Sequence, residues 1–399
     1  MSEKKNIFIL GYEEFTVNML KQLPMAKNIN FHPALTRNEM VSSEDIPAME
    51  IYKKAIDIIE SSNVEPDAVM TFWDFPATIV SSMLNARFGT IGPPVKSIFK
   101  CEHKGWSRSE QRKVIFDNIP RFACFDPKDE DAYRNINMLP PFWIKPVKSF
   151  RSYLSYKVND MKEFEEYREI MKEHVDGIYH PFTKLMQKAR VNDMISTSSE
   201  SCIAESSLDG HMCTLEGYVY EDEVITYGIV DSIKEKGYSS FQRYQYPSQL
   251  PMEIQYKMME VTRRIINHIG LNDTCFNIEF FYDQTNDEVF LLEINPRTSE
   301  SHTDLFYKVH GQTQLRLLLD IKLGRRPRPL ERKGEFLIGS KLFYRTFEPG
   351  IVTKVPTKKR IDEIIKKYPG TKIKMTVEQG DDLTDLMFKD AYSFELEFI

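Results

Sequence analysis

Two short apolar runs separated by a polar segment form the most informative stretch of the chain. Residues 276–282 and 289–294 are rich in aromatic and branched side chains, and residues 283–287, Asp-Gln-Thr-Asn-Asp, lie between them. This pattern predicts a β-hairpin with a connection slightly longer than the tightest turns. Each run carries one carboxylate, Glu279 in the first and Glu293 in the second. We therefore expect two acids on neighbouring strands of an otherwise apolar hairpin.

The second run ends in Glu-Ile-Asn-Pro-Arg. Side chains two residues apart share one face of a strand, so Glu293, Asn295 and Arg297 point the same way if the strand stays extended that far. Glu279 then lies opposite them. Two carboxylates and one amide oxygen suit Mg²⁺ held together with phosphates, and Arg297 adds a planar cation for a phosphoryl or carboxylate oxygen. The alternative is an ordinary amphipathic hairpin with two surface glutamates.

The first hundred residues alternate between strand and helix patterns. The expected strands are 7–10 and 67–72, and the expected helices are 14–23, 51–60 and 76–86. Such alternation is typical of a parallel sheet covered by helices. Gly11 follows the first strand without a GxGxxG pattern, which argues against nicotinamide binding.

The rest of the chain mixes short strands with longer helices. Strands are expected at 142–146, 216–220 and 224–230, and helices at 107–116, 161–175, 251–269, 304–310 and 313–323. Residues 324–329, Gly-Arg-Arg-Pro-Arg-Pro, read as a boundary. Beyond it we expect a small α+β tail with strands at 336–347, 350–355, 372–377 and 392–398 and a helix at 360–367.

Composition narrows the class of protein. A length of 399 residues with 41% apolar residues predicts two to three globular domains. The net charge of −6, with basic residues interspersed among acids, argues against nucleic-acid binding. Five cysteines without a CxxC pair indicate reduced thiols, and no apolar run is long enough for a membrane span or a signal peptide. We expect a soluble, cytoplasmic protein, and a homodimer stays open.

A glutamate in one strand, a polar turn and then Leu-Glu-Ile-Asn-Pro-Arg resemble the metal-binding signature of the ATP-grasp superfamily. That superfamily includes biotin carboxylase, carbamoyl phosphate synthetase, D-alanine–D-alanine ligase and the L-amino acid ligases. The resemblance implies an α/β and α+β fold with a doubly wound, Rossmann-like domain at 1–100, a lid subdomain at 101–200, a subdomain with the metal hairpin at 201–330, and a small extension at 331–399. It also implies that Glu279, Glu293 and Asn295 bind Mg²⁺ or Mn²⁺.

The same resemblance assigns two lysines to the phosphates of ATP. Lys104 precedes a predicted helix, and Lys145 interrupts an apolar strand, where a cation usually needs an anionic partner. A lysine on an edge strand that reaches solvent is the alternative for Lys145. Residues 147–154 occupy the place of the family's glycine-rich lid but contain no glycine. Ser149 and Ser152 are the hydrogen-bond donors expected there.

The segment 202–210, Cys-Ile-Ala-Glu-Ser-Ser-Leu-Asp-Gly, resembles the family's hinge around adenine. In that resemblance Glu205 accepts from the exocyclic amine, and Ser207 and Leu208 contribute main-chain groups. Met212 stands where many relatives have the acid that binds ribose. The ribose contact is therefore not assigned.

Two further segments lie where the family places substrate. Residues 237–251 are aromatic and basic, lack a clear helix or strand pattern, and contain Arg243 as their one arginine. Residues 298–302, Thr-Ser-Glu-Ser-His, end in His302. Arg243 is expected to face a carboxylate substrate. His302 is a candidate on the substrate side, although a lone histidine is more often structural.

These assignments imply a carboxylate–amine ligase, with Arg297, Arg243 and His302 as its catalytic candidates. ATP would phosphorylate a small carboxylate such as an amino acid, and an amine would attack the acyl phosphate, releasing ADP and phosphate. Three alternatives remain: a bicarbonate-activating enzyme of the biotin carboxylase or carbamoyl phosphate synthetase type, a phosphotransferase that stops at the phosphoryl step, and a non-catalytic ATP-binding regulatory protein. The expected partners are small molecules, without nucleic acid or membrane.

Overall fold

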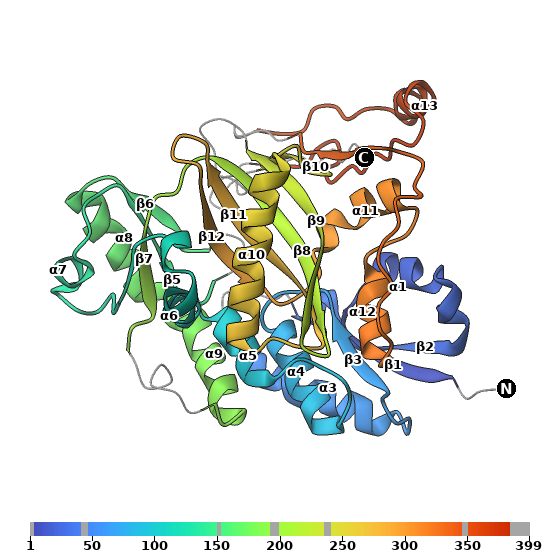
Figure 1. Cartoon of the computed structure of the whole chain (residues 1–399), viewed down its shortest axis with the longest axis horizontal. Coiled ribbons are helices and arrows are strands. Elements are labelled where there is room, and N and C mark those ends of the chain that lie inside the picture. Colours follow the sequence, from blue (N-terminus) through green and yellow to red (C-terminus); the bar gives the residue numbers. More distant parts are fainter. Residues whose placement is uncertain are drawn as a thin grey trace.

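Three β-sheets organise the described part of the chain, residues 4–40, 47–149, 153–191, 199–234, 241–344 and 350–383 of a computed structural model (Figure 1). One sheet is parallel and lies in the N-terminal region. The other two are antiparallel and are built from the middle and the second half of the chain. This confirms the expected mixture of α/β and α+β architecture.

The N-terminal sheet has the strand order β2 (Ile29–Thr36), β1 (Lys5–Tyr12), β3 (Ala68–Thr71). Successive residues of β1 face opposite sides, so Ile7 and Ile9 pack with α1 (Glu14–Lys21), while Phe8 and Leu10 pack with α3 (Ala48–Ser61) and α4 (Ala77–Phe88). The expected strands and helices of this region are therefore confirmed. The sequence analysis missed β2, in which His32 and Pro33 interrupt the apolar pattern.

Several short elements lie between the strands of this sheet or follow it in the chain. They are η1 (Pro24–Asn28), α2 (Arg37–Met40), α5 (Val95–Glu102), α6 (Lys104–Val114) and η2 (Phe116–Asn118). Helix α6 corresponds to the helix expected at 107–116. It begins earlier because the His103 side chain caps it, accepting a hydrogen bond from the Trp106 N–H at 3.0 Å.

The four-stranded sheet has the order β4 (Phe122–Phe125), β7 (Cys202–Ser206), β5 (Phe142–Pro146), β6 (Tyr156–Val158). Three helices accompany it, α7 (Ala132–Ile136), α8 (Met161–His174) and α9 (Asp176–Lys188). Phe142 and Ile144 of β5 are fully buried in a core shared with α8, while Lys145 falls on the alternate face. This sheet presents Lys145 towards the candidate site.

The six-stranded sheet has the order β12 (Glu288–Asn295), β11 (Thr274–Asp283), β8 (His211–Tyr220), β9 (Glu223–Lys234), β10 (Phe241–Tyr246), β13 (Gly339–Leu342). Helix α10 (Met252–Ile269) packs Ile254, Met258 and Ile265 in one core with Ile278 and Leu291 of the hairpin. It ends at Gly270, which adopts the left-handed conformation at φ 73°. The predicted hairpin, the strands predicted at 216–220 and 224–230, and the helix predicted at 251–269 are confirmed.

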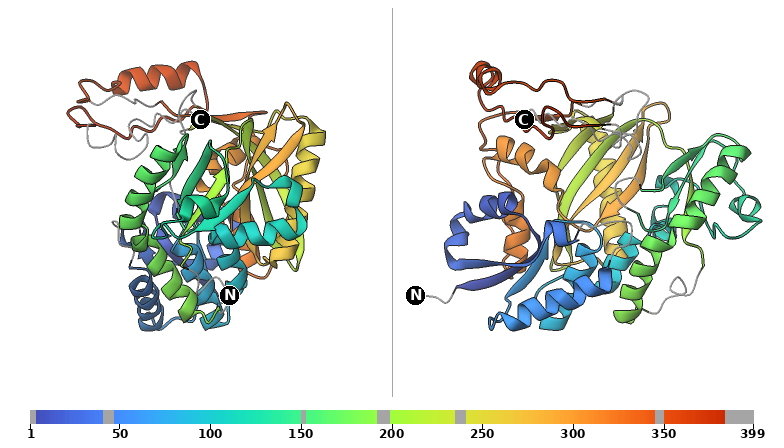
Figure 2. Two further views of the ribbon diagram at one scale, coloured as in Figure 1. Left: turned by 90° about the vertical axis from the view of Figure 1, so that its left-hand side faces the viewer. Right: turned by 180° about the vertical axis from the view of Figure 1, so that it is seen from behind.

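Helix α12 (Leu315–Lys322) joins the N-terminal sheet to the six-stranded sheet. Its residues Leu315 and Leu319 share a core with Ile7 of β1 and Cys275 of β11. Seen from behind in Figure 2, this orange helix lies beside the blue N-terminal strands. The adjoining elements are η4 (Glu300–His302) and α11 (Thr303–His310). The helices predicted at 304–310 and 313–323 are confirmed.

The C-terminal tail differs most from the sequence prediction. Helix α13 (Lys358–Lys367) is confirmed, but the strand expected over 336–347 is limited to β13 in the described residues. The described residues show no strand at 350–355 or 372–377, so these two predictions are wrong, and one isolated bridge joins Ile351 to Asp382. Residues 372–377 alternate in polarity but belong to none of the strands in the described residues. The strand expected at 392–398 lies outside the described residues.

The segment 237–251 also departs from prediction, because its part 241–246 forms strand β10. Its aromatic residues, for which no strand was predicted, suit a pleated surface between two neighbouring strands.

All five cysteines are free thiols. None of the helices in the described residues has the length and apolar character needed to cross a bilayer.

Candidate active site

The hairpin of β11 and β12 places its two acids directly opposite each other. Glu279 pairs with Glu293, and Asn277 pairs with Asn295, in the antiparallel register. The side-chain amide nitrogen of Asn295 donates a hydrogen bond to Asn277 Oδ1 at 3.1 Å. The side-chain oxygen of Asn295, Oδ1, is left for another partner. The expectation that Glu279 and Glu293 face each other is confirmed.

The strand does not stay extended as far as Arg297. Strand β12 ends at Asn295, and the Arg297 N–H donates to the Asn295 carbonyl at 2.8 Å, so the chain turns at Pro296. Pro296 has no N–H to continue the ladder. The condition under which Arg297 would share the strand face of Glu293 and Asn295, an extended strand as far as residue 297, is therefore not met.

The two hairpin glutamates have different electrostatic surroundings. Burial, and then repulsion from Glu293, raises the pKa of Glu279 from its usual 4.5 to about 7, although Lys234 opposes this. Burial also acts to raise the pKa of Glu293, but Lys104 and then Lys145 lower it overall. The surrounding cations therefore stabilise the charge of Glu293 but do not fully compensate a second negative charge on Glu279.

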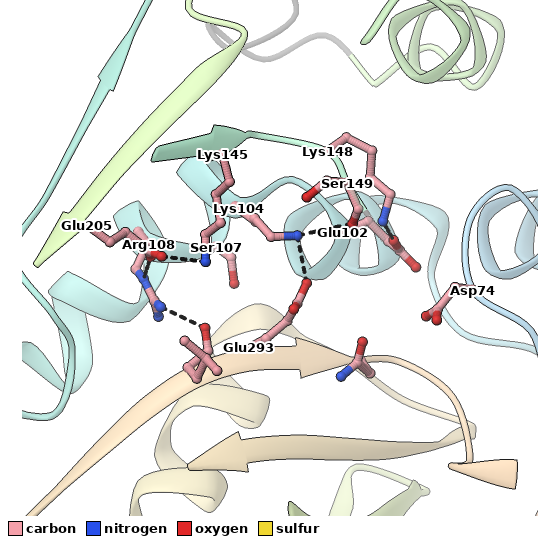
Figure 3. A network of polar contacts seen from close by, with 12 residues as sticks. Asp74, Glu102, Lys104, Ser107, Arg108, Lys145, Lys148, Ser149, Glu205 and Glu293 are labelled. Atoms are coloured by element: carbon pink, nitrogen blue, oxygen red, sulfur yellow. Dashed lines mark hydrogen bonds and ion pairs between the residues drawn. The ribbon is translucent and has the colours of Figure 1, made fainter. Parts of the chain in front are cut away.

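Three lysines approach this face from the other side (Figure 3). Lys104, the first residue of α6, donates from Nζ to Glu293 Oε1 at 2.8 Å and to the Ser149 carbonyl at 3.2 Å. Lys148 pairs with Glu102 where both are buried. The sequence analysis missed the role of Glu102 as an acid that holds a lysine next to the site.

Lys145 is the third lysine, and its observed partner is Glu205, at 2.5 Å. It lies on β5, which has neighbours on both sides, and its side chain is only 12% exposed. The alternative of a solvent-reaching lysine on an edge strand is therefore wrong. An anionic partner was expected, but in this structure it is a carboxylate of the neighbouring strand.

The hinge strand β7 holds Glu205 between two cations. Besides Lys145, the Nε of Arg108 donates to Glu205 Oε1 at 2.5 Å, and Arg108 also donates to the carbonyls of Leu291 and Leu292 at 3.0 and 2.6 Å. Burial would raise the pKa of Glu205, but Arg108 and Lys145 lower it to about 2. This cluster connects the four-stranded sheet to the hairpin of β11 and β12.

The predicted adenine residues follow directly on β7. Ser207 and Leu208 continue the chain beyond its last residue, and Ser207 Oγ donates to the Pro141 carbonyl at 3.4 Å. Because the Glu205 carboxylate already accepts from two cations, its expected contact with the adenine amine stays a prediction. Arg108 was missed by the sequence analysis, since its partners are far away in sequence.

Arg297 binds an acid that the sequence analysis also missed. Its Nε and Nη2 donate to the two oxygens of Asp74 at 2.6 and 2.7 Å. Asp74 follows strand β3, on the edge of the parallel sheet where α/β proteins commonly bind ligands. That position was the one available sequence signal.

The two substrate-side candidates have different environments. His302 is buried, its Nδ1 lies 2.8 Å from Glu216 Oε1, and its ring packs edge-on against Tyr244. Arg243 lies on β10, and its buried Nε has no hydrogen-bond partner among the described residues. The structure therefore connects His302 to a fixed acid and leaves Arg243 with an unused donor. Ser152 lies outside the described residues.

Within the described residues, no group of three or more His, Cys, Asp and Glu side chains is arranged to hold a metal. The hairpin set comprises two carboxylates and the amide of Asn295. Mg²⁺ commonly uses one or two carboxylates and completes its shell with water and substrate phosphates. The chemistry of these donors fits that pattern.

One family model matches the middle of the chain. Residues 138–303, which include Lys145, Glu205, the hairpin acids and Arg297, match the family model described as ATP-grasp domain. This match confirms, over residues 138–303, the resemblance noted from the sequence. No curated protein matches the sequence.

Solved structures share the fold over the whole chain. An L-amino acid ligase from Bacillus licheniformis has a TM-score of 0.74 at 18% identity and covers 100% of this chain and 94% of its own. An ATP complex of carboxyaminoimidazole ribonucleotide synthase from Aspergillus clavatus scores 0.69 at 13% identity, covering 100% and 94%. A biotin carboxylase from Campylobacter jejuni scores 0.61 at 15% identity, covering 100% and 88%. At these identities the similarity establishes the fold.

Proposed function

We propose that this protein is an ATP-dependent ligase that activates a small carboxylate as an acyl phosphate and couples it to an amine. The observation that carries the proposal is the placement of Glu279 opposite Glu293, with Lys104 in contact with Glu293. An acid pair next to buried lysines is the arrangement needed to hold a metal–polyphosphate complex.

ATP binds between the four-stranded sheet and the metal hairpin in this proposal. Lys104 and Lys145 contact the phosphates, and Ser149 and Ser152 contribute from the segment that takes the place of the lid. The main chain at Ser207 and Leu208 holds adenine. Because the Glu205 carboxylate pairs with Lys145 and Arg108, its role is to orient Lys145 as well as to line the adenine site.

Glu279, Glu293 and Asn295 hold Mg²⁺ or Mn²⁺. The ion supplies neutralisation of negative charge on the phosphates. Lys104 is released from Glu293 when it contacts a phosphate, so the two halves of this ion pair serve different parts of the ligand. Positioning and charge neutralisation then account for most of the catalysis.

The reaction has two steps. A carboxylate oxygen attacks the γ-phosphorus, the bond to the ADP oxygen breaks, and an acyl phosphate forms. An amine then attacks the acyl carbon, phosphate leaves, and the amine loses a proton. Arg297 stabilises the transferring phosphoryl group, Arg243 is the candidate for binding the substrate carboxylate, and His302, oriented by Glu216, lies on the substrate side.

This route needs no covalent intermediate on the protein. Ser299 and Ser301 precede His302, but their hydroxyl oxygens lie 3.0 Å from each other, and in the described residues neither hydroxyl is hydrogen-bonded to His302. A serine–histidine hydrolase would require the histidine to accept a proton from serine. The observed contacts favour a phosphoryl acceptor that the substrate brings.

Similarity to the L-amino acid ligase supports an amino acid as the carboxylate. The similarity to a biotin carboxylase supports bicarbonate as the second candidate. Both candidates use the same nucleotide and metal residues. They differ in the molecule that receives the phosphoryl group.

Product analysis tests the proposal. Purified protein, ATP and Mg²⁺ are incubated with single amino acids, amino-acid pairs or bicarbonate, and ADP, AMP and phosphate are measured. We expect ADP and phosphate only when a carboxylate is present, a hydroxamate when hydroxylamine replaces the amine, and one ¹⁸O atom from labelled carboxylate in the phosphate. AMP and pyrophosphate, or phosphate without the label, would overturn the mechanism.

A further inference from the structure

The guanidinium of Arg297 is held from one side by an acid of the N-terminal sheet. Both oxygens of Asp74 accept from it, at 2.6 and 2.7 Å, in the planar two-bond geometry that fixes an arginine most firmly. Asp74 lies after β3, whereas Arg297 lies two residues after the end of β12, and the two are separated by 223 residues. The pair therefore joins two sheets.

The ion pair lies next to the lysines of the candidate site. Figure 3 shows Asp74 on the same side as Lys148 and Glu102, facing the space towards Glu293. Burial acts to raise the pKa of Asp74, but Arg297, Lys148 and Lys104 lower it overall, so it is held as a carboxylate. A charged acid among cations that are needed for phosphate binding requires an explanation.

The geometry of Arg297 supplies one. Its Nε and Nη2 are used by Asp74, while Nη1 makes only a long contact of 3.4 Å with the Thr298 carbonyl. One edge of the guanidinium is thus fixed to the protein, and its remaining N–H groups are directed away from Asp74. The turn at Pro296 detaches Arg297 from the strand, so the backbone alone does not determine where this side chain points.

We propose that Asp74 is the positioning residue that orients Arg297 towards the phosphoryl group. This inference rests on the proposed function. Without Asp74, Arg297 keeps its charge but loses the fixed plane that directs its free N–H groups, and misplacement of such a group by about 1 Å can cost about 10²-fold in rate. The N-terminal sheet thereby contributes to the chemistry without touching the reacting atoms.

A second contact fastens the same loop to the N-terminal region. The Thr16 hydroxyl, on α1, donates to the carboxylate of Glu300. The loop between β12 and α11 is therefore attached at both Arg297 and Glu300. A purely structural role of Asp74 in joining the two sheets is the competing explanation, and the test must separate it.

Asp67 provides a matched control. It lies just before β3, its carboxylate pairs with Lys5 at 2.7 Å and accepts from the Asn6 N–H at 2.7 Å, and its side chain is 27% exposed against 34% for Asp74. Asp67→Asn and Asp74→Asn thus remove one charge from opposite ends of the same strand. Only the second change touches Arg297.

The experiment measures two affinities by calorimetry, that of MgADP and that of orthovanadate for the MgADP complex. We expect Asp74→Asn to bind MgADP within about twofold of the parent and to bind vanadate about tenfold more weakly, a change worth about 1.4 kcal/mol. Asp67→Asn should leave both affinities unchanged, and Asp74→Glu should recover part of the vanadate affinity. Melting temperatures record the structural contribution separately.

A double-mutant cycle completes the test. In an Arg297→Lys background, which keeps the charge but not the two-bond geometry, Asp74→Asn should cause little further loss of vanadate affinity. Unchanged vanadate affinity in Asp74→Asn, or losses that add fully in the double variant, would overturn the positioning role. Failure of the parent to bind MgADP would instead overturn the proposed function, and the inference with it.

Discussion

Glu205 is a buried glutamate of the four-stranded sheet and Glu279 is a half-buried glutamate of the six-stranded sheet, and their pKa values shift in opposite directions. Glu205 lies between Arg108 and Lys145, and its pKa falls to about 2. Glu279 is half-buried opposite a second carboxylate, and its pKa rises to about 7. The difference comes from neighbours, since burial alone raises the pKa in both cases.

This difference distinguishes two ion clusters. The charges are compensated in the hinge cluster, formed by Glu205, Arg108 and Lys145, and are not fully compensated in the hairpin cluster, formed by Glu279, Glu293 and Lys104. The hinge cluster compensates its charge within the protein, as buried charges must if they are to be tolerated. The hairpin face holds two acids whose principal cationic contact, Lys104, is also the candidate for a phosphate. A site that lacks compensating charge is one at which a metal ion lowers the energy. The comparison therefore distinguishes residues whose charges are compensated within the protein from residues that we propose to bind a ligand.

The largest expected effect is on ATP turnover and tests the hairpin cluster. Glu293→Gln removes a charge without changing shape, so we expect ATP turnover to fall by about 10³-fold or more while the protein remains folded. Glu288→Gln, an exposed position on the same strand, is the control and should keep full activity. Near-normal turnover of Glu293→Gln in Mg²⁺ would remove this residue from the site.

The next largest effect is on the free energy of unfolding and tests the hinge cluster. Glu205→Gln leaves Arg108 and Lys145 buried without a carboxylate, and removing one partner of a buried pair costs about 3–5 kcal/mol in the free energy of unfolding. Urea unfolding at pH 7 measures this loss. A variant as stable as the parent would show that the hinge cluster does not hold the structure.

The same variant has a distinct pH signature. Because the folded pKa of Glu205 is lowered from 4.5 to about 2, its contribution is complete above about pH 4.5 and is lost as pH falls through the folded pKa. We therefore expect the free energy of unfolding to decline less steeply in Glu205→Gln than in the parent as the pH falls below 4.5. Parallel curves would contradict the assignment.

Lys145 belongs to both parts of the comparison, because it completes the hinge cluster and is proposed to bind phosphate. Lys145→Ala should weaken ADP binding about 10- to 100-fold and also lower stability, since Glu205 loses one of its cations. Lys100→Ala removes a lysine of similar exposure, 16%, that pairs with Glu110 away from the site. If both variants bind ADP equally well, Lys145 is structural only.

The smallest effect has the opposite sign. Glu279→Gln relieves repulsion from Glu293, so we expect the metal-free protein to gain about 0.5–2 kcal/mol in unfolding free energy while losing activity. Thermal unfolding without Mg²⁺ and a turnover assay measure the two changes. A destabilised variant would mean that the two acids do not oppose each other.

The sequence predicted best what depends on local periodicity. The facing acids follow from two alternating runs and a short turn, and helix α10 follows from its apolar stripe and Gly270. The sequence did not predict partners brought together by the fold. Asp74 lies 223 residues from Arg297, and Arg108 lies 97 residues from Glu205, so no spacing rule connects them.

The strands at the far edge of the six-stranded sheet show the same limit. The residues of β10 lack a clean alternation, and β13 is only four residues long, yet they pair with each other from Arg243 with Leu342 to Tyr246 with Gly339. Residues 372–377 have the better strand pattern but belong to none of the strands in the described residues. Strands β10 and β13 form because the fold brings them side by side, and the local sequence pattern does not reveal such a partner.

That short pairing has a practical consequence for anyone shortening the protein. Strand β13 is the last strand of its sheet, so a version cut after α12 would leave the backbone donors and acceptors of β10 without their cover. Exposed strand edges recruit other strands, including those of identical molecules. Such a version is expected to self-associate on concentration, and a proline or an added lysine along 241–246 would be the remedy to engineer first.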